Sequence, residues 1–141
     1  MLSLSTMERP DYVDLFTIST TRITGGSPER WARAVVEKSA GSGGQFIWRV
    51  ILGLRLEGAP ERVGGWRVAD RGDDWLRLEA ASRLLTAHLL IQAIEGHLSV
   101  GTFIRYDSPV GRITWPPLAS VHRRLMPGLL RKAVSAFQMA E

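Results

Sequence analysis

The segment DDWLRLEAASRLLTAHLLIQAIEG, residues 73–96, decides between two folds. Leu, Ala, Glu and Arg dominate it, and these residues are good helix formers. The acids at its start and Gly96 at its end would suit the two ends of one long helix. The same residues can instead form strands that meet at turns. Local propensity favours the helix, so the choice depends on the sequence on either side.

The flanking sequence is typical of an antiparallel sheet. Residues 64–78, GGWRVADRGDDWLRL, are typical of two strands around a polar turn, in which Asp73 and Asp74 satisfy local backbone groups. Residues 89–107 read as two more strands around Glu95 and Gly96. A period of two predicts one face of the last strand, which consists of Leu98, Val100, Thr102, Ile104 and Tyr106.

The N-terminal part predicts one strand followed by two helices. Residues 12–20, YVDLFTIST, are rich in β-branched and aromatic residues and indicate a strand. A helix over 28–38 follows, with Ser27 as N-cap and Pro28 at its first position. Apolar residues at helical spacing predict a second helix over 45–58, although Gly53 inside it leaves an extended segment open.

The C-terminal stretch TWPPLASVHRRLMPGLLRKAVSAF, residues 114–137, predicts an amphipathic helix that starts at Pro116 and Pro117. Pro127 lacks a backbone N–H and should kink or split this helix. At about 100° per residue, His122 falls in the middle of an apolar arc, which consists of Leu118, Val121, Leu125, Met126, Leu129, Leu130, Ala133 and Phe137. The arginines lie on the opposite side, which indicates a solvated face. Weak contact of these arginines with an anionic membrane surface is the lesser alternative.

The order of these elements, with the end WPPLASVHRRLMPGLLRKA, resembles the START-like superfamily (SRPBCC), which includes Bet v 1-type allergens and polyketide cyclases. That end is also similar to uncharacterised actinobacterial proteins of the group. The resemblance implies an α+β helix-grip fold, in which a curved antiparallel sheet wraps around a long C-terminal helix, with two short helices after the first strand. It also implies an apolar cavity for greasy small molecules, and it supports the strand interpretation of residues 75–94.

Length and composition exclude several classes of protein. The 141 residues suit one domain over 11–141, preceded by a disordered leader over 1–10. The net charge of +4 does not indicate nucleic-acid binding, because the arginines are scattered from Arg9 to Arg131 among acids. No apolar run can span a bilayer and the start does not resemble a signal peptide, so we expect a cytoplasmic protein. The resemblance to actinobacterial proteins implies a bacterial one. A homodimer is left open.

Histidine is the residue type that carries most of the candidate chemistry. Because His122 lies on an apolar arc, the first interpretation is a hydrogen-bonded core residue and the second is a general base. Thr102 and Tyr106 are its candidate partners. His88 alternates away from its apolar neighbours and is expected to face outward. The absence of cysteine and of H-x-x-H spacing predicts no metal and no cofactor.

The sequence therefore predicts a carrier or sensor that binds a small hydrophobic or aromatic ligand, such as a lipid or polyketide-like molecule, without catalysis. The predicted ligand-binding residues line the space between sheet and C-terminal helix: Trp66, Leu85, Leu89, Val100, Thr102, Ile104, Tyr106, Val121, His122, Leu125 and Leu129. One alternative is a cyclase or aromatase that uses His122 and Tyr106. The other is a structural or interaction domain whose cavity is filled by its own tryptophans.

Overall fold

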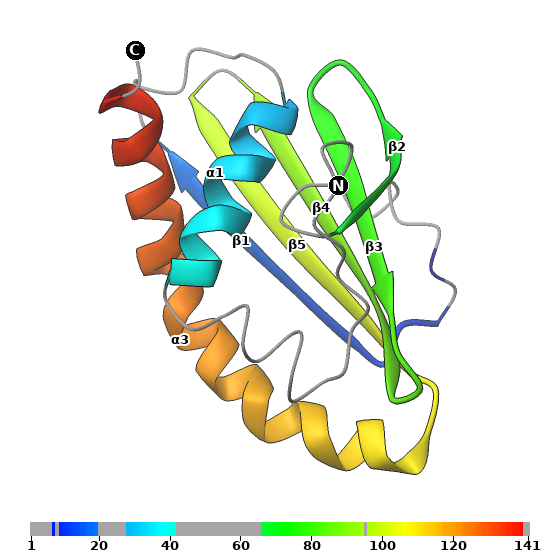
Figure 1. Ribbon diagram of the computed structural model, residues 1–141. Helices are drawn as coiled ribbons and strands as arrows, with labels where there is room; N and C mark the ends of the chain where they lie inside the picture. The colour runs from blue at the N-terminus through cyan, green and yellow to red at the C-terminus, as the bar shows by residue number, and fades with distance from the viewer. Residues whose placement is uncertain (1–6, 8, 20–27, 42–65, 95, 140–141) are drawn as a thin grey trace.

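The computed structural model describes residues 7, 9–19, 28–41, 66–94 and 96–139 (Figure 1). These residues form an α+β fold with five antiparallel strands in the order β1-β5-β4-β3-β2 and two helices. The elements along the chain are β1 (Tyr12–Ser19), α1 (Pro28–Gly41), β2 (Arg67–Arg71), β3 (Trp75–Ala81), β4 (Leu85–Ile94), β5 (His97–Tyr106) and α3 (Pro109–Met139). The helix-grip prediction is confirmed for this part of the chain. The second helix predicted over 45–58 lies outside the described residues.

The segment that decides the fold forms strands. β3 and β4 pair from Trp75↔Gln92 to Ala81↔Thr86. The Ser82 hydroxyl accepts the amides of Leu84 and Leu85 at 3.0 and 3.3 Å and closes the turn between them. β3 also pairs with β2, and β4 with β5. The backbone hydrogen bonds of both strands and the burial of their apolar side chains therefore depend on residues elsewhere in the sheet. These non-local contacts outweigh the local helix propensity.

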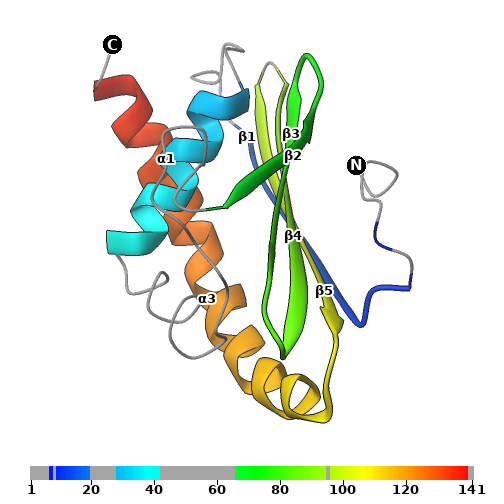
Figure 2. The same ribbon diagram turned by 45° about the vertical axis from the view of Figure 1, so that its right-hand side comes forward.

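Both helices lie on the same side of the sheet (Figure 2). Alternation in β5 places Leu98, Val100 and Ile104 on this inner face, as predicted, where they belong to the main core. Three fully buried tryptophans fill part of the layer between sheet and helices: Trp31 on α1, Trp66 just before β2, and Trp115 on α3. The inner layer is therefore assembled from large rings as well as aliphatic side chains.

Helix α3 differs from the prediction in its start and in its rotation. It begins at Pro109, runs through Pro116, Pro117 and Pro127, and curves along the sheet (Figure 1). The prediction that Val121 and Leu125 turn to the core is wrong, since they are 39% and 37% exposed. The later members of the predicted arc are buried as expected: Met126, Leu129, Leu130 and Ala133. Ala119 and Val134 are buried with them. The face of α3 that meets the sheet is therefore rotated away from Val121 and Leu125, toward Ala119 and Val134.

The outer face of the sheet is more buried than expected. Met7, predicted to belong to a disordered leader, packs against Leu90 and Phe103 and shields them from water. His88 faces outward as predicted but is buried, because the register places it in one row between Glu79 and Phe103. Burial lowers the pKa of His88, so it is neutral near pH 7.

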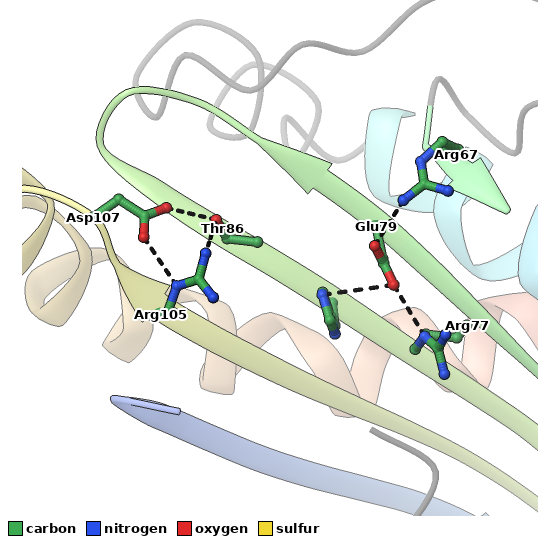
Figure 3. A network of polar contacts seen from close by, with 7 residues as sticks. Arg67, Arg77, Glu79, Thr86, Arg105 and Asp107 are labelled. Carbon is green, nitrogen blue, oxygen red and sulfur yellow. Dashed lines mark hydrogen bonds and ion pairs between the residues drawn. The ribbon is translucent and has the colours of Figure 1, made fainter. Parts of the chain in front are cut away.

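Glu79 is the centre of a polar network on this outer face (Figure 3). It accepts hydrogen bonds from Arg67 at 2.7 Å and from Arg77 at 3.0 Å, and His88 Nε2 lies 3.7 Å from its Oε2. Arg105, Asp107 and Thr86 form a neighbouring, more exposed group. Both groups hold a carboxylate about 3 Å from an arginine but differ in burial, so they can be compared in experiments.

Candidate functional site

Polar side chains of β1, β5 and α3 meet on the inner side of the sheet. Alternation in β1 turns Tyr12 and Asp14 toward the helices, and the register places Asp14 directly opposite Thr102 of β5. His122 reaches the same place from α3 and contacts both Asp14 and Thr102. We call Tyr12, Asp14, Thr102 and His122 the Asp14 cluster.

One oxygen of the Asp14 carboxylate organises the cluster. Its Oδ2 accepts a hydrogen bond from the Tyr12 hydroxyl at 2.6 Å and lies 3.2 Å from His122 Nε2. The Thr102 hydroxyl lies 3.1 Å from the same imidazole nitrogen. Outside the cluster, Arg123 donates to the Tyr12 hydroxyl at 3.4 Å. A chain of hydrogen bonds thus runs from an exposed guanidinium, through a phenol, to a carboxylate beside a histidine.

The cluster lies in a largely apolar setting. The side chains of Asp14 and His122 are only 7% and 12% exposed. The Trp115 ring packs edge-on against Tyr12 at 5.3 Å and at a tilt against His122 at 5.6 Å. Asp14 Oδ1 is buried and has no hydrogen-bond partner among the described residues. A buried acceptor without a partner costs about 1–3 kcal/mol, so this oxygen is the atom of the cluster that is suited to a further donor.

Tyr12 is strongly held in its neutral form. Burial raises its pKa to about 12, and the hydrogen bond to the Asp14 carboxylate adds to the effect. Burial also raises the pKa of Tyr106, the other tyrosine of the chain. Because the unfolded chain ionises its tyrosines near pH 10, these groups weaken the folded state as pH rises from about 10 through the folded pKa values.

A spectrophotometric titration of the phenol groups tests this arrangement. We expect the Tyr12 step in a Tyr106→Phe variant near pH 12, with Asp14→Asn moving it downward because the negative acceptor is removed. Circular dichroism at each pH must show that the chain is still folded. A midpoint near pH 10 in the Tyr106→Phe protein, the value for a free tyrosine, would contradict the Tyr12–Asp14 contact.

Most of the predicted ligand-binding residues are buried in the structure. Six of them are buried in the main core: Trp66, Leu85, Leu89, Val100, Ile104 and Leu129. Thr102 and His122 join the Asp14 cluster, which confirms the expected hydrogen bond between them. Val121 and Leu125 lie on the exposed side of α3. Ligand contact by any of these residues stays a prediction.

Tyr106 is not part of the cluster. It lies four residues beyond Thr102 on β5, about 13 Å along the strand, and it packs against the Arg112 guanidinium at 5.5 Å. The carboxylate beside His122 is that of Asp14, and the tyrosine that donates to it is Tyr12. Sequence reasoning missed both residues. The signal was available, because alternation in YVDLFTIS places one acid among the inward residues of a strand.

The remaining candidate features are the acid pair Asp73 and Asp74, metal-binding groups and membrane-spanning helices. Asp73 and Asp74 lie in the turn between β2 and β3, as predicted. Within the described ranges, no group of three or more His, Asp or Glu side chains is placed to hold a metal ion. Neither of the helices described here is long and apolar enough to cross a membrane.

Comparisons with known proteins add little beyond the fold. No family model matches the sequence, and neither does a curated protein. Among solved structures, the crystal structure of Ara h 8.0201 matches over 92% of this chain and 100% of that chain, with 12% identity and a TM-score of 0.36. At these values the fold assignment rests on the strand order and on the helix that crosses the sheet. The similarity to actinobacterial proteins stays a prediction.

Proposed function

We propose that this chain binds a small apolar or aromatic ligand between the sheet and α3, and that the ligand donates one hydrogen bond to Asp14. The observation that carries this proposal is the buried Oδ1 of Asp14, which has no hydrogen-bond partner among the described residues. An isolated polar atom in an apolar layer orients a ligand and selects for its chemistry. The proposed role is that of a carrier or sensor.

The residues around the cluster indicate the shape and polarity that the ligand should have. The row of the sheet that holds Asp14 and Thr102 continues with Leu89 and Leu78, both apolar and buried. Trp115 lies on the helix side. A ligand that reaches Oδ1 would therefore have a flat or aliphatic body and a hydroxyl or amine at one end. The extended apolar layer favours lipid-like and polyketide-like molecules over sugars or nucleotides.

A pair of probe molecules distinguishes binding that uses a hydrogen bond from binding by apolar contact alone. 2-Naphthol carries a hydroxyl donor, and 2-methoxynaphthalene has nearly the same body without one. We expect calorimetry to show 2-naphthol binding about tenfold to a hundredfold more tightly, because a hydrogen bond to a charged acceptor contributes about 1.5–3 kcal/mol. In Asp14→Leu this preference should disappear while 2-methoxynaphthalene binding changes little.

Thr102→Val is the matched control. It removes a fully buried hydroxyl that contacts His122 and leaves the Asp14 carboxylate in place. The preference for 2-naphthol should survive in this variant. Equal binding of both probes to the unmodified protein would refute a role for Asp14, and no binding of either would favour a domain whose inner layer is filled by Trp31, Trp66 and Trp115.

Native mass spectrometry of the purified protein would identify the ligand class directly. A co-purified small molecule that is released on denaturation and carries a hydroxyl or amine would support the proposal. A bound molecule without any donor would contradict the assignment of Oδ1.

Acid–base catalysis is the second candidate, favoured by the 3.2 Å contact between Asp14 and His122. A carboxylate that holds an imidazole is a common arrangement for proton transfer. Here His122 and Tyr12 both engage Oδ2, which leaves Oδ1 as the atom suited to accept a proton from a bound substrate. Deuterium exchange at the α-carbon of 2-tetralone, followed by NMR, tests this. Exchange that is lost in both Asp14→Asn and His122→Gln would indicate an enzyme.

A further inference from the structure

The face of α3 that points away from the sheet carries apolar side chains. Ile113 is 75% exposed, and Val110, Val121 and Leu125 are also exposed large apolar residues. Pro117 is exposed between them. At about 100° per residue these five positions fall within about one third of the helix circumference. We call Val110, Ile113, Pro117, Val121 and Leu125 the α3 outer stripe.

This stripe is separate from the face that folds the protein. The buried residues of α3, such as Trp115, Ala119 and Ala133, lie on the opposite side of the helix. Both views show the sheet on only one side of α3 (Figures 1 and 2). The stripe is therefore not needed to close the core, and an exposed apolar row on a helix that already has a core face indicates an interaction surface.

The charge of α3 indicates what kind of surface would cover the stripe. The 31 residues from Pro109 to Met139 include no Asp or Glu but contain Arg112, Arg123, Arg124, Arg131 and Lys132. All five basic residues are exposed. On the helical wheel, Arg124, Arg131 and Lys132 fall within the same third of the circumference as the stripe, beside or beyond its C-terminal end, rather than opposite it. An apolar row bordered by cations complements an anionic lipid surface, which offers both phosphate groups and an apolar layer beneath them.

We propose that the α3 outer stripe docks on the surface of an anionic lipid bilayer, with the helix lying in the plane of the interface. Ile113 and its apolar neighbours would enter the boundary between headgroups and acyl chains, and Arg124 and Arg131 would contact lipid phosphates. This surface lies on the other side of α3 from the Asp14 cluster. The two proposals can therefore fail independently.

Vesicle sedimentation tests the docking surface. The protein should sediment with phosphatidylcholine vesicles that contain phosphatidylserine and remain in solution with vesicles of phosphatidylcholine alone. We expect Ile113→Asp to weaken binding to the mixed vesicles about tenfold or more, because it places a charge in the apolar part of the contact. Arg124→Glu should weaken it about tenfold and reduce its salt dependence, since a basic side chain near an anionic surface contributes about 1 kcal/mol.

Ile94→Asp is the matched control, because Ile94 is also an exposed isoleucine, 46% accessible, but lies on β4. It should bind vesicles as the unmodified protein does, and melting temperatures should show that all variants fold. Val110→Asp repeats the test should Ile113→Asp not fold. Equal loss in Ile94→Asp, or undiminished binding by Ile113→Asp, would overturn the proposal. Two other results would also overturn it: a dimer that Ile113→Asp dissociates, or tighter binding to duplex DNA than to the mixed vesicles.

Discussion

Replacing Gly111 by alanine is expected to lower the free energy of unfolding by about 2 kcal/mol or more. Gly111 lies in the first turn of α3, where a Cβ atom would come within 2.2 Å of the carbonyl oxygen of Leu84. That oxygen also accepts the amide of Asp107 at 2.9 Å. The added Cβ would therefore clash with a backbone oxygen that is already fixed by a hydrogen bond. To remove the clash, the start of α3 would have to move away from the β3–β4 turn. Urea unfolding followed by circular dichroism measures the change.

Gly128→Ala in the same helix is the control for this prediction. The nearest atom to its added Cβ is the end of the flexible Arg131 side chain at 3.8 Å. Alanine also has a higher helix propensity than glycine by about 1 kcal/mol, so this variant should be as stable as the unmodified chain or more so. Similar losses at both positions would show that the start of α3 does not approach Leu84 as closely as the structure has it.

Glu79→Ala should destabilise the fold by about 2 kcal/mol, because two guanidinium groups lose hydrogen bonds to a carboxylate and hydrogen bonds to charged groups contribute about 1.5–3 kcal/mol. Glu79 is the carboxylate that Arg67 and the mostly buried Arg77 both contact (Figure 3). Without it, Arg77 keeps its position beside His88 in a poorly hydrated part of the outer face. Chemical denaturation at pH 7 measures the loss.

Asp107→Ala removes the corresponding carboxylate from the neighbouring group. Its partner Arg105 is half exposed, and exposed pairs contribute about 1 kcal/mol or less. We therefore expect a small change at Asp107 and a large one at Glu79, although both lose an arginine contact at about 3 Å. Comparable losses would mean that burial of Arg77 does not govern the strength of the network.

Periodicity within single strands predicted more of this structure than propensity did. The inward set of β5 followed from alternation, and the helix that begins at Pro28 followed from its N-terminal residues. Residues 75–94 could not be assigned from local sequence, because their composition favours a helix while their neighbours in the sheet favour strands. The correct assignment depended on the resemblance to a known family, not on propensity.

The errors share one cause, which is contact with residues far away in the chain. His88 was assigned to the outside correctly, but only the row formed with Glu79 and Phe103 explains its burial. Met7 looked like part of a leader because the apolar surface it covers belongs to β4 and β5. The rotation of α3 that leaves Val121 and Leu125 exposed and buries Ala119 is set by how the helix packs on the sheet.

By itself, the sequence determined the strands β1 and β5, the inward set of β5 and the start of α1, since all of these depend on spacing within one element. Only the tertiary structure decided that Asp14 would meet Thr102, Tyr12 and His122. That meeting requires β1 to pair with β5 in one register and α3 to cross them at one rotation. Pairing and rotation are set by packing between distant segments, which no local pattern encodes.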